Sequence, residues 1–465
     1  MKQTTIRAEL EDFLKRKVTT INQFAEASGV NSGTISNIIN GNRPIAMQQL
    51  DRITEGMGLV PGFFYELYAD ECFIGSTPNW RRLRPFLYRC AELDKLDNIR
   101  WVVSMMMDNL SYASVLFETA ETFFKEGKHK AAVLLYENVA EGEKYQHSER
   151  LALCRYRLFT AALGNDQDVN LRAAVHFESF VDRLDEVDQL DALKDLANTY
   201  SSLHRWDKVE ELAKRMGCKA SIQYANRHVE ARRDGFQKEP AMPLFSYILY
   251  SYVLCSVVYG ELGDYDRALH YVSLYSDMSW IQENNEEVLQ LMNQCMGWAK
   301  ANTSLFKLLK GESRVLPEYV SYIEQRKDEI LPALFKILQA ANQHHFNVDD
   351  ILLRFEQEIS SYRNQQGTIG TYNEQVIADG YCHFMAELAS YYFNQGKYGN
   401  GVKCIIDSLG VSVKINNEAC IIRCVGLFEQ FRYAATPEAQ KQYQNLISEV
   451  QRRNEKKTGF VVGVI

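Results

Sequence analysis

Proline is scarce in this sequence, with nine residues in 465. Because proline lacks a backbone N–H and ends most helices, its scarcity favours long helices over a strand-and-turn architecture. The ten cysteines are scattered singly, and no paired spacing suggests a disulfide framework or a zinc site. Cys420 and Cys424 come closest, but four residues apart on a helix they are interpreted as small core residues. We therefore expect neither a metal nor a cofactor.

Long apolar runs are also missing. No run approaches the roughly 18 apolar residues that cross a bilayer. The N-terminus, from Met1 to Glu11, carries too many charges for a signal peptide. We therefore expect a cytoplasmic protein with no membrane partner.

No catalytic constellation stands out. The sequence has no phosphate-binding glycine loop and no nucleophile elbow. His344 and His345 precede Asp349 and Asp350, but adjacent histidines do not easily face one metal, so a solvated loop is the favoured interpretation. The sequence thus predicts a protein that is not an enzyme.

What the sequence does contain is enough apolar residues to fill more than one ordinary core. Hydrophobic residues make up 46% of the chain. The formal net charge of −8 argues against a protein that coats nucleic acid with its whole surface. In residues 1–68, seven basic side chains balance seven acidic ones. Any role in DNA binding must therefore depend on local geometry.

Apolar residues at helical spacing divide residues 1–68 into five short helices. The expected helices are Ile6–Lys17, one that begins after Thr19 or Thr20, Ser32–Asn40, Met47–Met57 and Pro61–Tyr68. Gly29 permits a left-handed turn between the second and third helices. The last two helices are expected to complete the core through Leu50, Ile53, Leu59, Phe63, Phe64 and Leu67.

The third of these helices is short and mostly polar. Ile35, Ile38 and Ile39 anchor it to the core, which leaves small hydroxyl and amide side chains facing out. Such side chains suit base edges and phosphates in a major groove. The predicted DNA-binding residues are Asn31, Ser32, Thr34, Ser36, Asn37 and Arg43.

The segment from Ile21 to Arg43 resembles the phage-repressor-like helix-turn-helix family. The resemblance includes the turn from Ala25 to Gly29 and the core spacing of Ile35, Ser36 and Ile38, and it covers nearly all of residues 5–68. It implies double-stranded DNA as a partner. The alternative is a degenerate domain kept for dimerisation, which the neutral charge allows.

Beyond an arginine-rich connector, four segments align without gaps on one turn. Each has a small residue seven positions before the turn residue and an aromatic residue four positions before it. The turn residues are Gly127, His204, Gly263 and Gly396, the small residues are Ala120, Ala197, Ser256 and Ala389, and the aromatic residues are Phe123, Tyr200, Tyr259 and Tyr392.

This pattern resembles the tetratricopeptide repeat, in which small residues let two helices cross closely and aromatic residues fill the space between pairs. His204 stands where glycine is usual at the turn, and Gly401, five residues after the last turn residue, stands where alanine is usual. The expected fold is all-α, with a five-helix helix-turn-helix domain followed by a tetratricopeptide-like α-solenoid. The expected divisions are 1–68 for the DNA-binding domain, 69–100 for a helical connector, 101–410 for the repeats and 411–465 for C-terminal capping and dimerisation helices.

If the first helix of each repeat lines a concave groove, its inward side chains are candidates for binding an extended peptide. An asparagine can both donate to and accept from a peptide backbone, and a Lys–Asp pair suits the terminal charges. The predicted peptide-binding residues are Asp191, Lys194, Asn198, Ser201, Ser202, Tyr250, His383, Ser390 and Asn394, with Val253 and Phe393 beside them. The alternative is an unused groove with solvated polar residues.

A DNA-reading domain joined to such repeats is similar to the peptide-pheromone receptors called RRNPP, and within them most like the arbitrium receptors. The segment from Tyr65 to Leu93 carries part of that second resemblance. The resemblance implies a homodimer in which a short signalling peptide controls DNA binding. The apolar tail, Phe460–Ile465, is a candidate contact between subunits, with a frayed end as the alternative.

A competing hypothesis is an adaptor whose repeats bind a protein partner such as a response regulator. Relatives of that kind generally have a helical bundle where this chain has the predicted DNA reader.

Overall fold

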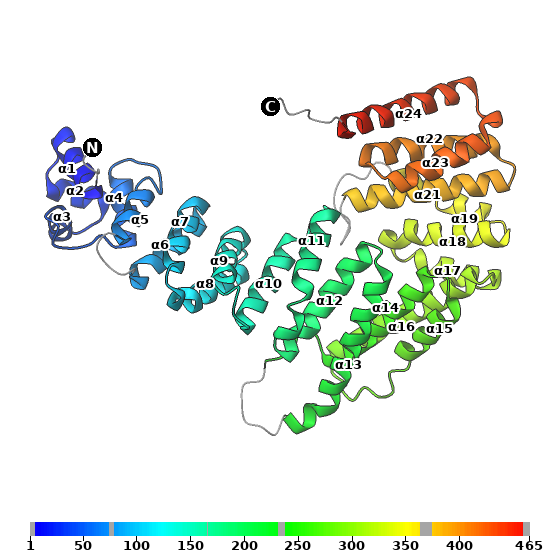
Figure 1. Cartoon of the computed structure of the whole chain (residues 1–465), viewed down its shortest axis with the longest axis horizontal. Helices are drawn as coiled ribbons and strands as arrows, with labels where there is room; N and C mark the ends of the chain where they lie inside the picture. Colours follow the sequence, from blue (N-terminus) through cyan, green and yellow to red (C-terminus); the bar gives the residue numbers. More distant parts are fainter. Residues whose placement is uncertain (1–4, 74–78, 165, 231–237, 363–373, 459–465) are drawn as a thin grey trace. The chain divides into compact units, whose positions relative to one another are not determined.

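The structure is a computed structural model that describes residues 5–73, 79–164, 166–230, 238–362 and 374–458 (Figure 1). Most of these residues lie in helices, and none of them forms a strand. The predicted all-α class is therefore confirmed for the described residues. The chain divides into two compact units, residues 1–163 with 169–192, and residues 164–168 with 193–465.

Unit 1 begins with five helices, which are α1 (Ile6–Lys17), α2 (Ile21–Ser28), α3 (Ser32–Ile39), α4 (Met47–Gly56) and α5 (Tyr65–Phe73). The first four begin where the sequence predicts. The fifth begins later than predicted because Gly62, with a φ of 82°, turns the chain just before it. Phe63 lies in that turn and is 55% exposed, so its predicted core position is wrong.

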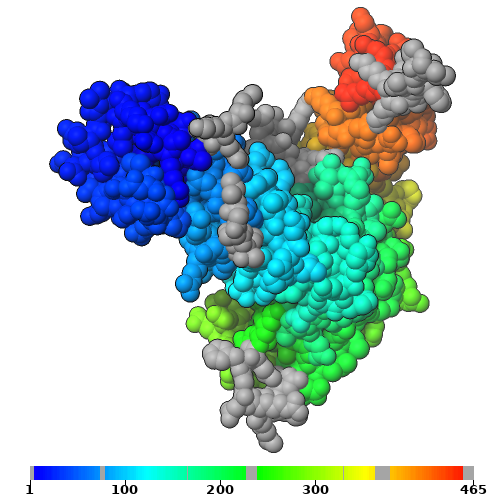
Figure 2. Space-filling model, turned by 60° about the vertical axis from the view of Figure 1, so that its left-hand side comes forward, coloured from blue at the N-terminus to red at the C-terminus, as the bar shows by residue number. Residues whose placement is uncertain are grey.

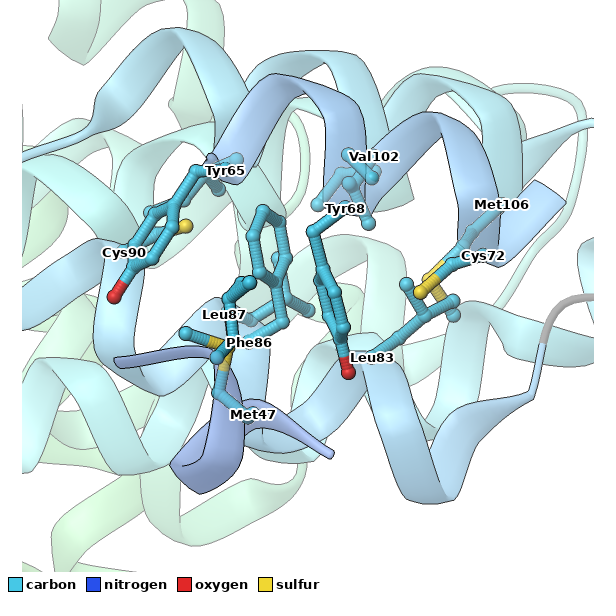
Figure 3. Packing of buried hydrophobic residues seen from close by; sticks show 14 of the residues in the cluster. Met47, Tyr65, Tyr68, Cys72, Leu83, Phe86, Leu87, Cys90, Val102 and Met106 are labelled. Carbon is cyan, nitrogen blue, oxygen red and sulfur yellow. The ribbon is translucent and has the colours of Figure 1, made fainter. Parts of the chain in front are cut away.

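Six further helices of unit 1 follow, namely α6 (Trp80–Glu92), α7 (Leu96–Met107), α8 (Ala113–Lys125), α9 (His129–Gly142), α10 (Glu149–Ala162) and α11 (Gln167–Glu178). One apolar core runs from α1 through α10. At the centre of Figure 3 the ring of Phe86 on α6 packs between Tyr65 and Tyr68 of α5, with centroid distances of 5.3 and 5.5 Å. In Figure 2 the dark-blue surface of the first helices is accordingly continuous with the lighter blue of α6 and α7.

Helix α12 (Glu186–Ser202) begins in unit 1, and its residues from Leu193 onward belong to unit 2. Unit 2 continues with α13 (Trp206–Glu230), α14 (Leu244–Glu261), α15 (Tyr265–Ser276), α16 (Glu286–Leu309), α17 (Leu316–Ile323), α18 (Ile330–His344), α19 (Asp349–Arg354), α20 (Glu356–Tyr362), α21 (Glu374–Asn394), α22 (Tyr398–Ile415), α23 (Glu418–Gln430) and α24 (Pro437–Thr458). Most neighbours in sequence pack as antiparallel pairs, as Figure 1 shows for α21 and α22. The predicted tail contact, Phe460–Ile465, lies outside the described residues.

The four aligned segments form helix pairs with one shared turn. Gly127, His204, Gly263 and Gly396 all have left-handed backbone, with φ between 53° and 78°. In each pair the amide after the turn residue donates to the carbonyl of the aligned aromatic residue at 2.8–2.9 Å, a helix-ending bond of the Schellman type. The four aligned small residues are fully buried. The sequence alignment therefore gave the correct register for all four turns, including the one at His204.

Helix α14 differs from the expectation that no segment is long and apolar enough to cross a bilayer. Its 18 residues reach a mean hydropathy of 1.2, which meets that requirement by length and composition. However, 67% of the segment is buried inside the protein, where it packs between α13 and α15. A helix buried in a protein core passes the same test, and α14 is mostly buried.

Candidate DNA-binding and peptide-binding sites

The candidate DNA-binding surface is built on α2 and α3, which local sequence positions closely. The Thr20 hydroxyl accepts from the Gln23 amide at 3.3 Å, and the Gln23 side chain accepts from the Thr20 amide at 2.9 Å, so α2 begins with a reciprocal cap. Gly29, with a φ of 64°, ends α2 and turns the chain toward α3. Arg52 on α4 donates to the Gly29 carbonyl at 3.1 Å, which supports the turn.

The predicted DNA-binding residues lie at the two ends and along the outer face of α3. Asn37 and Arg43 are exposed, whereas Ser32, Thr34 and Ser36 are half-buried. Ile35 and Ile38, which hold the helix down, are fully buried. Asn37 is therefore the most accessible amide on the helix.

Two of the predicted residues also have local roles within α3. The Asn31 side-chain oxygen caps the helix by accepting from the amides of Gly33 and Thr34, at 2.9 and 3.4 Å. The Ser36 hydroxyl accepts from Asn40 Nδ2 at 3.4 Å. Asn31 and Ser36 would have to keep these hydrogen bonds while contacting DNA. They are therefore weaker candidates than Asn37.

Sequence analysis did not identify Arg7, although it lies beside this surface. A Cβ placed on Gly41, in the turn after α3, would meet the Arg7 guanidinium at 2.9 Å. Arg7 stands on α1, far from the polar segment in sequence, and only its charge could have suggested it. It adds a cation next to the end of α3.

The predicted peptide-binding residues of α12 and α14 are partly brought together. The hydroxyl of Tyr250 donates to Asn198 Oδ1 at 2.6 Å, and the Asn198 side chain is exposed. Burial raises the pKa of Tyr250, so its hydroxyl stays protonated as a donor. Lys194 lies 3.6 Å from Asp195, which already gives its ammonium a carboxylate neighbour.

The remaining predicted residues of α12 are less distinctive. Asp191 and Ser201 are half-buried, and the Ser202 hydroxyl donates to the Thr199 carbonyl of its own helix at 2.8 Å. Val253 on α14 is also half-buried. On α12, Asn198 is the predicted residue that an extended ligand could reach most directly.

On α21 the predicted residues diverge. Asn394 donates to Asn342 Oδ1 of α18 at 3.1 Å, and the Ser390 hydroxyl donates to its own helix at Ala386. The side chain of His383 lies instead 3.3 Å from Asn417, the N-cap of α23. Phe393 is only 5% exposed, so its predicted place in a groove is wrong.

The burial of Phe393 has a visible cause. Its ring stacks on Phe431 at a centroid distance of 4.0 Å. Its edge also occupies the space that a Cβ at Gly401 would need, which explains glycine where alanine is usual.

A cavity of about 430 Å³ in unit 2 is lined by none of the predicted residues. Amide side chains of α18 line it, namely Gln339, Asn342 and Gln343, together with the Lys336–Glu261 ion pair at 2.7 Å. A sequence signal existed, because amides at positions i, i+3 and i+4 interrupt an otherwise apolar helix. That helix aligns with none of the four repeat segments, so the repeat pattern does not point to it.

The wall of this cavity is held by a buried carboxylate. Glu387 on α21 is 7% exposed, accepts from Asn342 Nδ2 at 2.8 Å and forms an ion pair with Arg423 of α23. Asn342 therefore links Glu387 to Asn394. The result is a polar network across three helices, with amide groups at the edge of a cavity that could accept a peptide backbone.

Two groups of described residues bring three metal-ligand atoms within 4.8 Å of one another. One is Glu149 with Asp185 and Asp188, and the other is Asp379 with Cys382 and His383. In the second group the Asn417 amide donates to Asp379 and lies 3.3 Å from His383 and 4.0 Å from Cys382. An amide thus already serves as the shared partner of these three side chains.

A comparison with protein-family models finds no match for this chain. A comparison with curated proteins finds none either.

Proposed function

We propose that this chain is a transcriptional regulator that binds a DNA operator through α3 and a short signalling peptide through its helical repeats. It acts in the cytoplasm as a homodimer, and the peptide modulates operator binding. The proposal places it with regulators of the RRNPP type, on the resemblance of the segment from Ile21 to Arg43 and of the four repeats. Within that type it looks most like the arbitrium receptors.

The observation that carries the DNA part of the proposal is the polarity of α3. Two fully buried isoleucines fix the helix, whereas its other side chains, apart from the half-buried Ile39, carry hydroxyl or amide groups. Those groups read base edges in a major groove. Residues 1–68 carry no net charge, so affinity for DNA must come from specific side-chain contacts rather than from the overall charge.

The peptide part is supported by amides and ion pairs at the edges of helices in unit 2. The Asn198–Tyr250 pair offers an exposed amide, and the cavity beside α18 adds the amides of Gln339 and Gln343. Amide side chains can hold an extended backbone whatever side chains the peptide carries. The Lys336–Glu261 pair offers charges of both signs for peptide termini.

Selection from a pool of random duplexes tests the DNA part, because such a pool contains every short operator sequence. The full chain is expected to enrich one palindromic motif, because a dimer reads two half-sites. The Asn37→Ala variant should enrich the same motif less strongly or not at all. Failure of the parent protein to enrich any motif would contradict DNA reading and favour the adaptor.

Calorimetric titration with short synthetic peptides tests the other part. Binding of a peptide should alter the affinity for the enriched duplex, since linkage requires that two coupled ligands affect each other. A peptide that binds with no effect on the duplex affinity would contradict the regulatory coupling.

A further inference from the structure

The connector helix α6 carries a larger excess of positive over negative charge than any of the five helices before it. Arg81, Arg82, Arg84 and Arg89 fall within its 13 residues, and its one acidic residue is Glu92 at the last position. Arg81 and Arg84 are exposed at the beginning of the helix. This charge lies in the same compact unit as α3 and α4.

A cavity of about 500 Å³ lies between α4 and α6. Arg81 and Arg82 line it from α6, Met47 and Gln48 line it from the first turn of α4, and Tyr68 reaches it from α5. Arg89, which also lines the cavity, is paired with Asp51 at 2.9 Å and with Glu92 at 2.7 Å. The carboxylates neutralise Arg89, so the excess positive charge lies toward Arg81 and Arg82.

The first turn of α4 adds backbone donors. Its N-cap is Ala46, whose side chain cannot accept a hydrogen bond from the amides of Met47 and Gln48. The first amides of a helix have no partner within the helix, and they carry partial positive charge. An anion in the cavity would supply the missing acceptor.

Two buried polar atoms beside the cavity also lack a hydrogen bond of normal geometry, although Arg82 and Cys72 lie close enough to the Tyr68 hydroxyl to affect its pKa. These are the hydroxyl of Tyr68, whose side chain is fully buried, and Nε of Arg82. The Arg82 guanidinium lies 5.2 Å from the centre of the Tyr68 ring. Figure 3 shows the Tyr68 ring beside that of Phe86, with its hydroxyl at the end away from its own helix. Buried donors without a partner are costly, and both of these would be satisfied by an acceptor oxygen.

We propose that this cavity binds a phosphate group, and that the sugar–phosphate backbone of DNA bound at α3 supplies it. The inference rests on the proposed function. The DNA source is favoured because the cavity begins at Ala46, three residues after Arg43 in the turn that follows α3. The phosphate would accept from Arg81, Arg82 and the first amides of α4, and so the connector extends the DNA contact beyond the first five helices.

The salt dependence of binding to a random-sequence duplex tests this proposal on the full chain. Each phosphate contact contributes about −0.9 to the slope of log K against log salt concentration. Arg81→Gln and Arg82→Gln should each make the slope shallower by about one unit if both contact phosphates. Arg100→Gln on α7, an exposed arginine paired with Asp97, is the matched control and should leave the slope unchanged.

Tyr68→Phe separates a ligand role from a packing role. It removes only the unpaired hydroxyl, so the thermal midpoint should stay the same or rise. Affinity for the duplex should fall about ten- to a hundredfold, as expected for one lost hydrogen bond to a charged group. Unchanged affinity would remove Tyr68 from the site.

The outcomes distinguish failure of the proposed DNA binding from failure of the phosphate site. A parent protein that binds no duplex overturns the proposed function, and the phosphate site with it. A parent that binds with the same salt slope as both arginine variants overturns the phosphate site alone. If inorganic phosphate raises the thermal midpoint of the parent but not of Arg82→Gln, while the DNA slope is the same for both, the site serves a free phosphorylated ligand and the DNA assignment is wrong.

Discussion

The hydroxyl of Tyr250 on α14 donates a 2.6 Å hydrogen bond to the side-chain oxygen of Asn198 on α12. This bond fixes the orientation of the amide, because its oxygen faces Tyr250 and its NH₂ group must then face the other way. An exposed, pre-oriented amide loses little conformational freedom when a ligand binds.

Replacing Asn198 with Ala is therefore expected to weaken peptide binding. Loss of a hydrogen bond to a peptide backbone corresponds to about 1 kcal/mol, or roughly fivefold in affinity. Tyr250→Phe should produce a smaller loss, because it frees the amide without removing it. Calorimetry with the cognate peptide measures both, and helical content should be unchanged. Equal affinity for parent and Asn198→Ala would show that the peptide binds elsewhere, with the cavity beside α18 as the next place to test.

The second prediction concerns base reading by α3. Asn37→Ala or Thr34→Ala should reduce specific operator binding by about 1 to 3 kcal/mol if either side chain contacts a base edge. Non-specific binding to unrelated duplexes should change little, because bases contribute nothing there. A gel-shift titration measures both quantities. Unchanged operator affinity across alanine variants of Asn31, Ser32, Thr34, Ser36, Asn37 and Arg43 would exclude α3 as the reading helix.

A homodimer built through the C-terminal region is the third prediction. Ile422 on α23 is 71% exposed and Tyr433, shortly after that helix, is 74% exposed, so these two apolar side chains are candidates for contact with a second subunit. Sedimentation should show a dimer, and Ile422→Asp should shift it toward monomer. Val175→Asp on α11, which likewise replaces an exposed apolar side chain with a charge, should leave the dimer unchanged. A full chain that is monomeric when bound to its operator would eliminate the dimer.

Truncation after Lys457 tests the apolar tail separately. A dimer that persists without Phe460–Ile465 would rule the tail out as the essential contact.

The fourth prediction is a pH-dependent contribution from Glu121. Its carboxylate accepts from the Tyr136 hydroxyl at 2.6 Å and from Arg157 at 3.0 and 3.1 Å. Burial alone would raise the pKa of Glu121, but these hydrogen bonds outweigh it and hold the pKa below the usual value. A lowered pKa in the folded state means that the stabilisation is present above the unfolded pKa of about 4.3 and is lost as pH falls through the folded value.

Glu121→Gln should therefore lower the urea midpoint at pH 7, by an amount equivalent to about 2 kcal/mol. The difference from the parent should shrink at pH 3. Glu141→Gln, which alters an exposed ion pair with Lys144, is the control and should have no measurable effect at either pH. An equal loss for Glu121→Gln at both pH values would contradict the charge-based explanation.

The fifth prediction uses two glycines that differ in backbone conformation. Gly263 has a φ of 78° and open space around its Cβ position, so Gly263→Ala should destabilise unit 2 by about 1 kcal/mol through backbone strain alone. Gly380 lies inside α21 with ordinary helical backbone and equally open space. Gly380→Ala should therefore stabilise by about 0.5 to 1 kcal/mol. Thermal midpoints that move in the same direction for both variants would contradict this assignment of the turn.

Much of the fold was accessible from the sequence because its signals are local. Caps such as Thr20 and turn residues such as Gly29 act over a few positions, so helix starts could be predicted from neighbouring residues. The repeat turn is equally local, and even His204 was placed correctly because the flanking small and aromatic residues fixed the alignment. Phe63 was misplaced because apolarity alone does not say whether a residue faces a turn or the core.

The candidate sites were less accessible because they depend on contacts between distant segments. Asn342 and Glu387 are 45 residues apart, and no spacing rule connects them. Likewise the burial of Phe393 follows from Phe431, and the position of His383 follows from the cap at Asn417. Such partners come from the packing of α18, α21 and α23, which a single sequence does not display.

The close fit of Phe393 against Gly401 has a consequence for relatives of this chain. A side chain at position 401 and a large ring at position 393 exclude each other sterically, so the two positions are expected to covary. Homologues with alanine at 401 should carry a smaller residue at 393, and those that keep phenylalanine should keep glycine. A repeat profile that requires alanine at position 401 would therefore miss this repeat. A profile that scores positions 401 and 393 together would retain it.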